Sequence, residues 1–372
     1  MFTFEGRPVE FSLVRDIDPL RDDWLALEAD HAPSAYQRFT FVREWSGHVA
    51  RAVGLEPRIL VGRSAGRTVV IAPLALKRRP LPLLMPLSDS HTNLNGGLFA
   101  DGVAGGDLAG TALRLEAEAE GFEACCMRED DAKLYGDQPI RSVHDAFVAR
   151  VDEGFDAFLA RNSGKRKRKK HRRSVRHFDE LGGWHVERLG TRTDLRVVLD
   201  EAWSWMAARF KRDGIDDPFA PPEVRAFFLE ACASCLDDDR PALGLWRLVV
   251  GGRTAAIMAA GFGGRGYAPM FTSYRTGGVE GDSPGEFLIY ELCKMAADMD
   301  CEEFDLGRGR EPYKLSWTDG PVTLYDLRIA RTARASVYLG TRTWLSRAKR
   351  GVRDDERLWV IAKHVRAAVG RR

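Results

Sequence analysis

The chain carries one pattern twice. The strings GRTVVIAPLA from Gly66 and GRTAAIMAAG from Gly252 each place an apolar run after a turn, and each follows another strand-like run. Such a pair of runs is typical of a β-hairpin. Downstream, a helical pattern followed by a short strand also recurs, from Leu113 and from Leu288, with nearly the same separation. Two features repeated at one spacing predict two copies of one α/β unit.

The length agrees with a duplicated chain. At 372 residues the chain is long enough for two domains of ordinary size. We expect an N-terminal domain over 1–150, a C-terminal domain over 151–330 and a basic helical tail over 331–372. In each domain the order is mainly strand, two helices, three strands, helix, two strands. The predicted class is α/β (α+β), with a mixed, mostly antiparallel sheet flanked by helices in each domain.

Apolar runs and cysteines exclude several classes of protein. The longest runs, such as LPLLMPL from Leu81, are interrupted well before the roughly 18 residues of a membrane-spanning helix. The first residues lack the basic start and cleavage site of a secretory signal. These features predict a cytoplasmic protein. Cys232 and Cys235 form a CxxC without a second pair at zinc-ribbon spacing, so we expect reduced core thiols and no metal.

The positive charge is concentrated in two zones, although the net charge is only +2. Residues 165–177 hold nine Lys or Arg and no acid, and residues 331–372 hold twelve basic and three acidic residues. Such zones favour anionic partners, but most charge runs are solvated surface. We rank a solvated helix first, contact with substrate anions or an anionic membrane surface second, and binding of tRNA third. Contact with an anionic membrane would place the protein at the periphery of the inner membrane.

Three strings in the second half carry a resemblance to a known family. They are RKRKKHRRSVRHFDELGG from Arg166, TSYRTGGVEGDSPGEFLIYELCKMA from Thr272 and FDLGRGREPYKLSW from Phe304. With the element order, they resemble GNAT-type acyltransferases in duplicated form, nearest the CelD-like acetyltransferases of bacterial cellulose synthesis and more distantly the Fem-type aminoacyl transferases of peptidoglycan. The resemblance covers about 164–327 and is weak in the first half.

The resemblance implies two GNAT-like domains, the first of them degenerate. It implies an N-acyltransferase that takes acetyl-CoA or another acyl-CoA, uses no metal, and transfers the acyl group directly to an amine or a sugar-linked acceptor in polysaccharide or cell-envelope metabolism. One alternative is aminoacyl transfer from charged tRNA, as in Fem-type enzymes. The other is a non-catalytic duplicate that binds anions or nucleic acid. Donor-dependent thermal stabilisation separates the first from the others.

A helix start is readable at Ser283, where a capping hydroxyl is followed by Pro284 and, three residues after the cap, by Glu286. The segment is either only a well-capped helix or a cradle for a pyrophosphate, with Gly285 allowing close approach. The resemblance implies that coenzyme A binds at Ser283, Pro284 and Gly285. Glu286 places negative charge beside the expected anion.

The loop ahead of this helix matches the superfamily pattern in part. Arg275 and Gly278 fit the usual sequence of the loop, and the resemblance assigns them to donor binding. Glu280 occupies the position where the superfamily has Gly or Ala. This departure weakens the assignment of the donor more than that of the fold.

Four residues are candidates for the chemistry of acyl transfer, which needs a proton acceptor, donors to the thioester oxygen and a proton for the leaving thiolate. Asp305 ends a strand. It either orients the nucleophile or accepts its proton, or it ties down the glycine turn that follows. Tyr313 is the candidate proton donor. Lys314 either steadies the oxyanion or a donor phosphate, or forms a structural ion pair. Tyr274 is a second candidate proton donor, or a packing residue.

A polar loop in the first half is the candidate acceptor site. It contains Asp89, His91, Asn93 and Asn95 within SDSHTNLNGG. In a duplicated fold whose second copy holds the donor, this loop would shape the acceptor pocket. A plain turn rich in Asn and Asp is the structural alternative, which we favour slightly.

Overall fold

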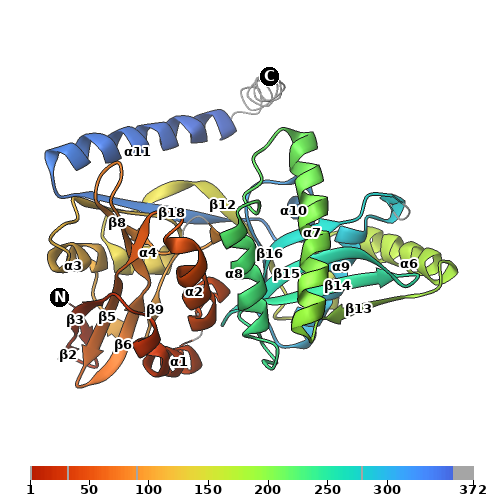
Figure 1. Ribbon diagram of the computed structural model, residues 1–372, viewed down its shortest axis with the longest axis horizontal. Coiled ribbons are helices and arrows are strands. Elements are labelled where there is room, and N and C mark those ends of the chain that lie inside the picture. The colour runs from red at the N-terminus through yellow and green to blue at the C-terminus, as the bar shows by residue number, and fades with distance from the viewer. Residues whose placement is uncertain (1, 32, 89–90, 278–279, 355–372) are drawn as a thin grey trace. The chain divides into compact units, whose positions relative to one another are not determined.

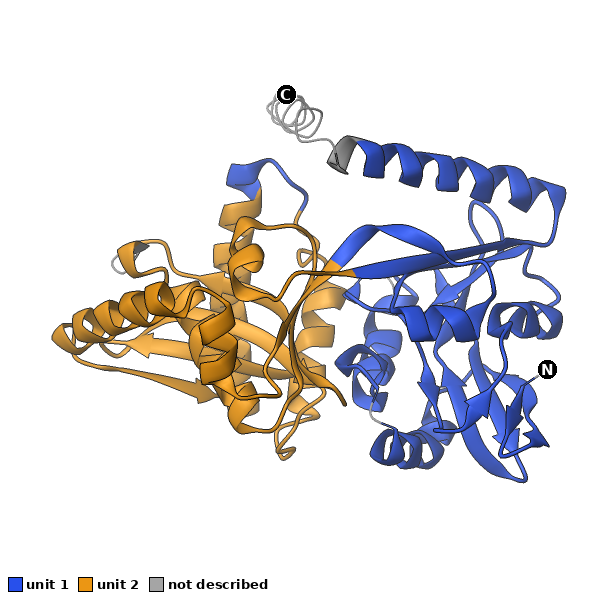
Figure 2. Cartoon of the chain, turned by 180° about the vertical axis from the view of Figure 1, so that it is seen from behind, with its two compact units in different colours: residues 1–145, 211–216, 323–372 blue, residues 146–210, 217–322 orange. Residues whose placement is uncertain are grey.

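The computed structural model describes residues 2–31, 33–88, 91–277 and 280–354, so Asp89 and Gly278 lie outside the described residues. The chain divides into two compact units, coloured separately in Figure 2. Unit 1 comprises Met1–Asp145, Lys211–Asp216 and Thr323–Arg372, and unit 2 comprises Ala146–Phe210 and Asp217–Val322.

Unit 1 is built from short strands and five α-helices in its described part (Figure 1). Its strands are β1 (Thr3–Phe4), β2 (Arg7–Pro8), β3 (Glu10–Val14), β4 (Leu55–Pro57), β5 (Ile59–Ser64), β6 (Arg67–Ala72), β7 (Leu74–Lys77), β8 (Leu83–Pro86), β9 (Leu98–Phe99), β10 (Val103–Ala104), β11 (Gly121–Met127) and most of β18 (Pro321–Ala330). Its helices are α1 (Arg21–Asp30), α2 (Phe39–Trp45), α3 (Leu108–Leu115), α4 (Glu129–Tyr135) and α11 (Ala333–Asp354).

Unit 2 has longer strands and longer helices. Its strands are the second part of β12 (Ile140–Arg150), β13 (Trp184–Arg188), β14 (Gly244–Val250), β15 (Arg253–Phe262), β16 (Gly266–Tyr274) and β17 (Glu303–Arg308). Its helices are α5 (Phe155–Arg161), α6 (Gly164–Glu180), α7 (Arg192–Asp213), α8 (Pro222–Ala233), α9 (Pro284–Asp298) and α10 (Pro312–Trp317). The last residues of α7 are grouped with unit 1.

The duplicated hairpins predicted from the sequence are confirmed. In unit 1 the neighbouring strands follow the order β3, β5, β6, β9. In unit 2 they follow the order β13, β14, β15, β16. Every neighbouring pair in both sets is antiparallel. Both hairpins turn through two residues with positive φ, Ala65–Gly66 and Gly251–Gly252. This is the turn whose twist matches that of paired strands. A helix and a strand then follow in each unit, so the predicted fold class is correct.

The last strand of each half of the sequence pairs with a strand from the other half. β12 follows β11 in the chain but pairs antiparallel with β17, with Val148 opposite Asp305. β18 follows β17 but pairs antiparallel with β11, with Ile329 opposite Phe122. The observed units are therefore discontinuous in sequence, unlike the ranges 1–150 and 151–330. The basic segment after residue 330 contributes α11 to unit 1.

The sheet of unit 2 is covered by helices on both faces. One face packs against α5, α6 and α9, whose buried residues Phe158, Phe178 and Phe287 join a core that includes Met258 of β15. On the other face Phe271 of β16 contacts aromatic rings of α7 and α8, with ring centroids 5.0 Å from Trp203 and 5.2 Å from Phe228. Within the described ranges, every helix is too short or too polar to cross a bilayer.

Candidate functional site

Strands β16 and β17 are parallel neighbours that separate along their length. Their paired residues are Gly266 with Glu303 and Tyr267 with Phe304, at the beginning of both strands. Just beyond, Pro269 has no N–H to donate, and Met270 forms a bulge because two residues of β16 oppose one of β15 there. β16 then continues to Tyr274 without pairing to β17. The carboxyl ends of the two strands therefore leave an unpaired strand edge between them.

Helix α9 begins shortly after β16 and presents an unused donor at its first turn. The predicted start is confirmed, with Ser283 as N-cap and Pro284 as the first helical residue. The Ser283 hydroxyl makes no capping hydrogen bond. The Ser283 carbonyl accepts from the N–H groups of Glu286 and Phe287. The N–H of the buried Gly285 has no partner among the described residues. The positive end of the helix thus has a free N–H for an anion.

The ring of Tyr274 lies against Gly285. A Cβ built at Gly285 would be 3.1 Å from Cδ1 of Tyr274 and 3.7 Å from Cγ2 of Thr272. Tyr274 is 39% exposed, so its ring is not part of the core. The tyrosine at the end of β16 therefore covers the start of α9 from the strand side, where a ligand of that helix start would contact it.

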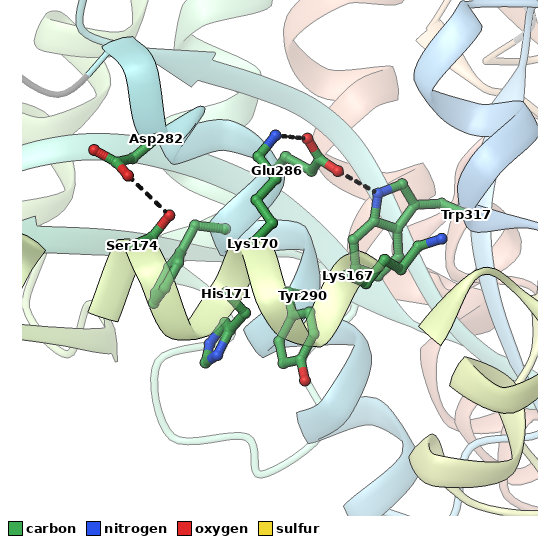
Figure 3. A pocket seen from close by; sticks show the side chains of 9 residues that line it. Lys167, Lys170, His171, Ser174, Asp282, Glu286, Tyr290 and Trp317 are labelled. Carbon is green, nitrogen blue, oxygen red and sulfur yellow. Dashed lines mark hydrogen bonds and ion pairs between the residues drawn. The ribbon is translucent and has the colours of Figure 1, made fainter. Parts of the chain in front are cut away.

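The carboxylate of Glu286 is neutralised by its neighbours (Figure 3). One oxygen accepts from Nε1 of Trp317 at 3.3 Å, and the other pairs with Nζ of Lys170. The same ammonium donates to Oγ of Ser283 at 3.0 Å. Glu286 therefore does not close a capping box, and its charge is balanced by a cation at the helix start. The sequence suggested that the Glu286 carboxylate would repel an anion, and the positive charge of Lys170 offsets this repulsion.

Helix α6 holds the short turn that leads into α9. Asp282 is buried. Its Oδ1 accepts from Oγ of Ser174 at 3.1 Å, and its Oδ2 lies 2.6 Å from Nδ1 of His177. Arg173 donates to the carbonyl of Gly281 at 3.0 Å. The basic run therefore positions the helix start, which is a structural role that its charge alone does not reveal.

One face of the basic run is buried, so this helix is not solvated on all sides. Lys167 is 4% exposed, donates to the carbonyls of Asn162 and Ser316, and lies 5.1 Å from the ring centroid of Trp317. His171 stacks on Phe287 and Tyr290 with centroid distances of 4.7 Å and 4.0 Å. Burial, with a smaller contribution from Arg166, lowers the pKa of Lys167.

The opposite face of α6 carries exposed cations. They are Lys165, Arg166, Lys169, Arg172 and Arg176. Their spacing of three or four residues places them along one side of the helix. None of the five forms an ion pair within the part of the chain that the structure describes. This side of α6 is therefore a stripe of uncompensated positive charge.

A small pocket lies between α6, α9 and Trp317, lined by residues of both helices (Figure 3). Its volume is about 20 Å³, enough for roughly one water molecule. It is too small for an acyl donor. The pocket marks where α6 and α9 meet, and the candidate donor site is the helix start with the unpaired edge of β16.

Tyr313 is the second residue of α10. Although 40% of the residue is exposed, desolvation of the phenol raises the pKa of Tyr313, with a further rise from Glu311 that Arg209 opposes. Arg209, on α7, also donates to the carbonyl of Thr272 on β16 at 3.3 Å. Tyr313 is therefore a protonated phenol near a guanidinium that contacts the unpaired part of β16.

Asp305 and Lys314 make local contacts. Asp305 is buried and accepts from the N–H of Gly307 at 2.8 Å, as in the structural alternative. Nζ of Lys314 donates to the carbonyl of Arg308 at 2.8 Å and pairs with Glu311 at 2.8 Å. Both side chains thus brace the segment between β17 and α10. Their catalytic roles stay predictions.

The remaining predicted residues lie in two places. The Arg275 guanidinium lies 5.8 Å from the ring centroid of Trp205 on α7. In unit 1, Nδ1 of His91 accepts from Trp45 at 3.2 Å, Asn93 donates to the Tyr36 hydroxyl at 2.7 Å, and Asn95 donates to the carbonyl of Cys125 at 2.8 Å. The described part of the polar loop is thus tied to its own unit, and its role in acceptor binding stays a prediction.

Two residues of the site were missed by reasoning from the sequence. Lys170 lies inside the basic run. The only signal for its role is that it lies three residues after Lys167 and four before Ser174, which places it on the buried face of the helix. Arg209 lies in a polar stretch at the end of α7 and no local pattern distinguishes it. Its contact with Thr272 depends on the packing of α7 across the sheet.

Comparison with known proteins agrees with this geometry. Residues 165–315 match the family model described as acetyltransferase (GNAT) domain. No curated protein matches the sequence significantly. The matched segment begins at the basic helix and ends in α10, so it contains β16, β17, α9 and Tyr313.

Solved structures share the fold over nearly the whole chain. FemX is 12% identical with a TM-score of 0.58, covering 89% of this chain and 99% of its own. The C-terminal domain of a putative lysylphosphatidylglycerol synthetase from Agrobacterium fabrum is 10% identical with a TM-score of 0.54, covering 89% and 98%. L-PGS from Bacillus licheniformis is 13% identical with a TM-score of 0.51, covering 88% and 95%. The chain therefore shares the fold of these structures, and residues 165–315 in its second half match the GNAT domain model.

Proposed function

We propose that unit 2 transfers an acyl group from acyl-CoA, with acetyl-CoA as the first donor to test, to an amine or a sugar-linked acceptor. The observation that carries the proposal is the separation of β16 from β17 directly ahead of α9, inside the segment that matches the GNAT domain model. An unpaired strand edge beside a helix start offers backbone partners to an extended donor and an anion site to its phosphates.

The residues at the helix start fit a phosphorylated donor. The Gly285 N–H has no partner among the residues that the structure describes, and the Lys170 ammonium lies at the first turn of α9 beside Ser283. Bound there, the donor supplies a thioester whose carbonyl carbon is attacked by the acceptor. The Gly285 N–H and Lys170 would hold its phosphates, and Tyr274 would contact it from β16.

Proton transfer is assigned to Tyr313. A phenol whose pKa is raised stays protonated at neutral pH, so it suits donation to a leaving thiolate and not removal of a proton from the acceptor. Arg209 lies close enough to influence this pKa, and its positive charge would stabilise the phenolate until it regains a proton, which the acceptor amine loses after its attack. The strings that resemble CelD-like enzymes favour an acceptor of the cell envelope.

Acetyl-CoA is expected to stabilise the protein against heat. A ligand that binds only the folded state at 100 times its dissociation constant adds about 2.7 kcal/mol to the free energy of unfolding. For a domain of this size, that corresponds to an increase of about 5 to 10 °C in Tm. Differential scanning fluorimetry with and without acetyl-CoA measures it. No increase at saturating concentrations would contradict the proposed donor.

Replacing Gly285 by Val is expected to raise KM for acetyl-CoA about 10- to 100-fold, with a smaller effect on kcat. The valine side chain must displace the Tyr274 ring and obstructs the free N–H, whose charge-assisted hydrogen bond contributes about 1.5–3 kcal/mol. Gly281→Val is the matched control, because a Cβ at Gly281 has no heavy atom within 4 Å. Equal KM values in the two variants would remove the helix start from the donor site.

A second candidate, aminoacyl transfer from charged tRNA, is favoured by the exposed cation stripe of α6. Neutralising phosphates along this stripe would make RNA binding fall steeply with salt. Filter binding with bulk tRNA at increasing salt tests it. Salt-sensitive tRNA binding that weakens in Lys169→Gln/Arg172→Gln, without any stabilisation by acetyl-CoA, would favour tRNA as the source of the acyl group.

A further inference from the structure

Helix α11 is anchored to unit 1 along one side. Ala335 and Leu339 are buried against Leu81 and Leu83. Farther along, the same side is polar, and Arg342 pairs with Glu123 of β11 at 2.8 Å. This combination of apolar and ionic contacts determines which face of α11 is turned away from unit 1.

Buried charges support this orientation. Glu123 also pairs with Arg328 of β18 at 2.8 Å, and Arg328 donates to Oγ of Ser346 on α11 at 3.4 Å. At the start of the helix, Arg334 pairs with Glu120. The contacts recur from residue 334 to residue 346, so α11 is held over most of its described length and is not a loosely attached tail.

The opposite side of α11 exposes large apolar side chains. Val337 is 73% exposed, Trp344 is 66% exposed and Leu345 is 44% exposed. Gly340, Thr341 and Ala348 lie on the same side at helical spacing, and none of them carries a charge. An ordinary surface helix turns its apolar side to the core and its charges to water. Beyond Leu339, α11 does the reverse.

Cations border this apolar side. Arg347 follows Trp344 by one turn, and Lys349 lies beyond Leu345 on the other flank. Both are exposed, and among the described residues neither forms an ion pair. From Ala333 to Arg350 the sequence contains five basic residues and no acidic residue. A partner that covers this face therefore has to accept an apolar centre and bring negative charge to its edges.

We propose that the face of α11 formed by Val337, Trp344, Leu345, Arg347 and Lys349 docks the protein on a bilayer with anionic headgroups. Trp344 and Val337 enter the boundary between headgroups and acyl chains, where indole rings are favoured. Arg347 and Lys349 meet the lipid phosphates. A second copy of the chain does not fit as the partner, because packing two such faces together would oppose cations with cations.

Vesicle co-sedimentation of the full chain tests the proposal. We expect binding to vesicles of equal parts phosphatidylcholine and phosphatidylglycerol to exceed binding to phosphatidylcholine vesicles about tenfold or more, and to fall as salt is raised. Val337→Ser/Trp344→Ser and Arg347→Gln/Lys349→Gln are each expected to reduce binding about tenfold. Light scattering reports the oligomeric state of each protein in the same buffer.

Matched controls separate this face from general basicity. Lys165→Gln/Lys169→Gln removes the same charge from the exposed stripe of α6, and Leu115→Ser removes an exposed apolar side chain from α3. Both are expected to bind vesicles within about twofold of the unmodified protein. Brominated lipid is expected to quench part of the tryptophan fluorescence, and less of it in Trp344→Phe, which keeps an aromatic anchor.

Three results would overturn the proposal. The first is that the protein does not bind anionic vesicles. The second is that the α6 variant loses vesicle binding while the α11 variants keep it. The third is that the protein does not bind vesicles and forms a dimer, which becomes monomeric in Val337→Ser/Trp344→Ser. The α11 residues changed here belong to unit 1, whereas the donor-site residues named above belong to unit 2. Acyl transfer in solution is therefore expected to be unchanged, so this test is independent of the proposed enzyme activity.

Discussion

Replacing Tyr313 by Phe is expected to lower kcat about 100-fold or more while changing KM for acetyl-CoA about twofold at most. The substitution removes only the hydroxyl, so the ring and its packing on α10 are retained. A proton donor acts mainly when the thiolate leaves, and its loss therefore affects turnover more than donor binding. Steady-state kinetics with a thiol-detecting reagent measures both constants.

The pH profile gives a second readout for Tyr313. Because desolvation raises the pKa of Tyr313, its hydroxyl stays protonated as pH rises through the ordinary tyrosine value of about 10. The proposed donor therefore causes no decline in kcat at that pH. Tyr274→Phe is the matched control, since Tyr274 is exposed to the same extent but contacts the helix start. Unchanged kcat in a folded Tyr313→Phe protein would remove the assignment.

Replacing Lys167 by Ala is expected to lower the free energy of unfolding of unit 2 by about 3 kcal/mol. The substitution leaves the carbonyls of Asn162 and Ser316 without their donor and removes the ammonium from the Trp317 ring. The expected decrease in Tm is about 6 to 12 °C. Because Ser316 and Trp317 belong to α10, turnover by Tyr313 on the same helix should fall as well.

Lys169→Ala is the control for Lys167→Ala. It removes the same charge two residues farther along α6, but from the exposed stripe, and should change the free energy of unfolding by no more than about 0.5 kcal/mol. Lys167→Met should remain destabilising, because it keeps the aliphatic chain over Trp317 and loses the donor. Equal Tm values for Lys167→Ala and Lys169→Ala would show that the buried ammonium contributes nothing to the docking of α6.

The hairpins and the start of α9 could be predicted because their signals are local. Paired glycines at Gly251 with apolar runs on both sides specify a turn between two strands, and proline after Ser283 specifies a helix start. The exchange of β12 and β18 between units could not be predicted in this way. Both strands have the same alternating pattern, and their partners are selected by contacts between residues far apart in sequence.

The candidate site was predictable only in part. The helix start predicted at Ser283 is confirmed, while the roles of Ser283, Gly285 and Tyr313 toward an acyl donor stay predictions. Asp305 and Lys314 contact backbone groups of their own loop, because Gly307 and Arg308 are within reach of their side chains, and their catalytic roles stay predictions. Arg209 gives no signal in the sequence, since its importance depends on the carbonyl of a strand more than sixty residues away.

The basic run separates the two kinds of information. Its composition alone specifies a helix with high positive charge, because lysine and arginine favour helix and no acid interrupts them. Which charges are buried, and what they bind, was decided by tertiary packing. Lys167 and Lys170 are turned toward α9 and Trp317, where carbonyls and a carboxylate accept their hydrogen bonds, while the cations of the exposed stripe remain in water. Such pairing lowers the desolvation cost of a buried charge, and only the folded chain brings the partners together.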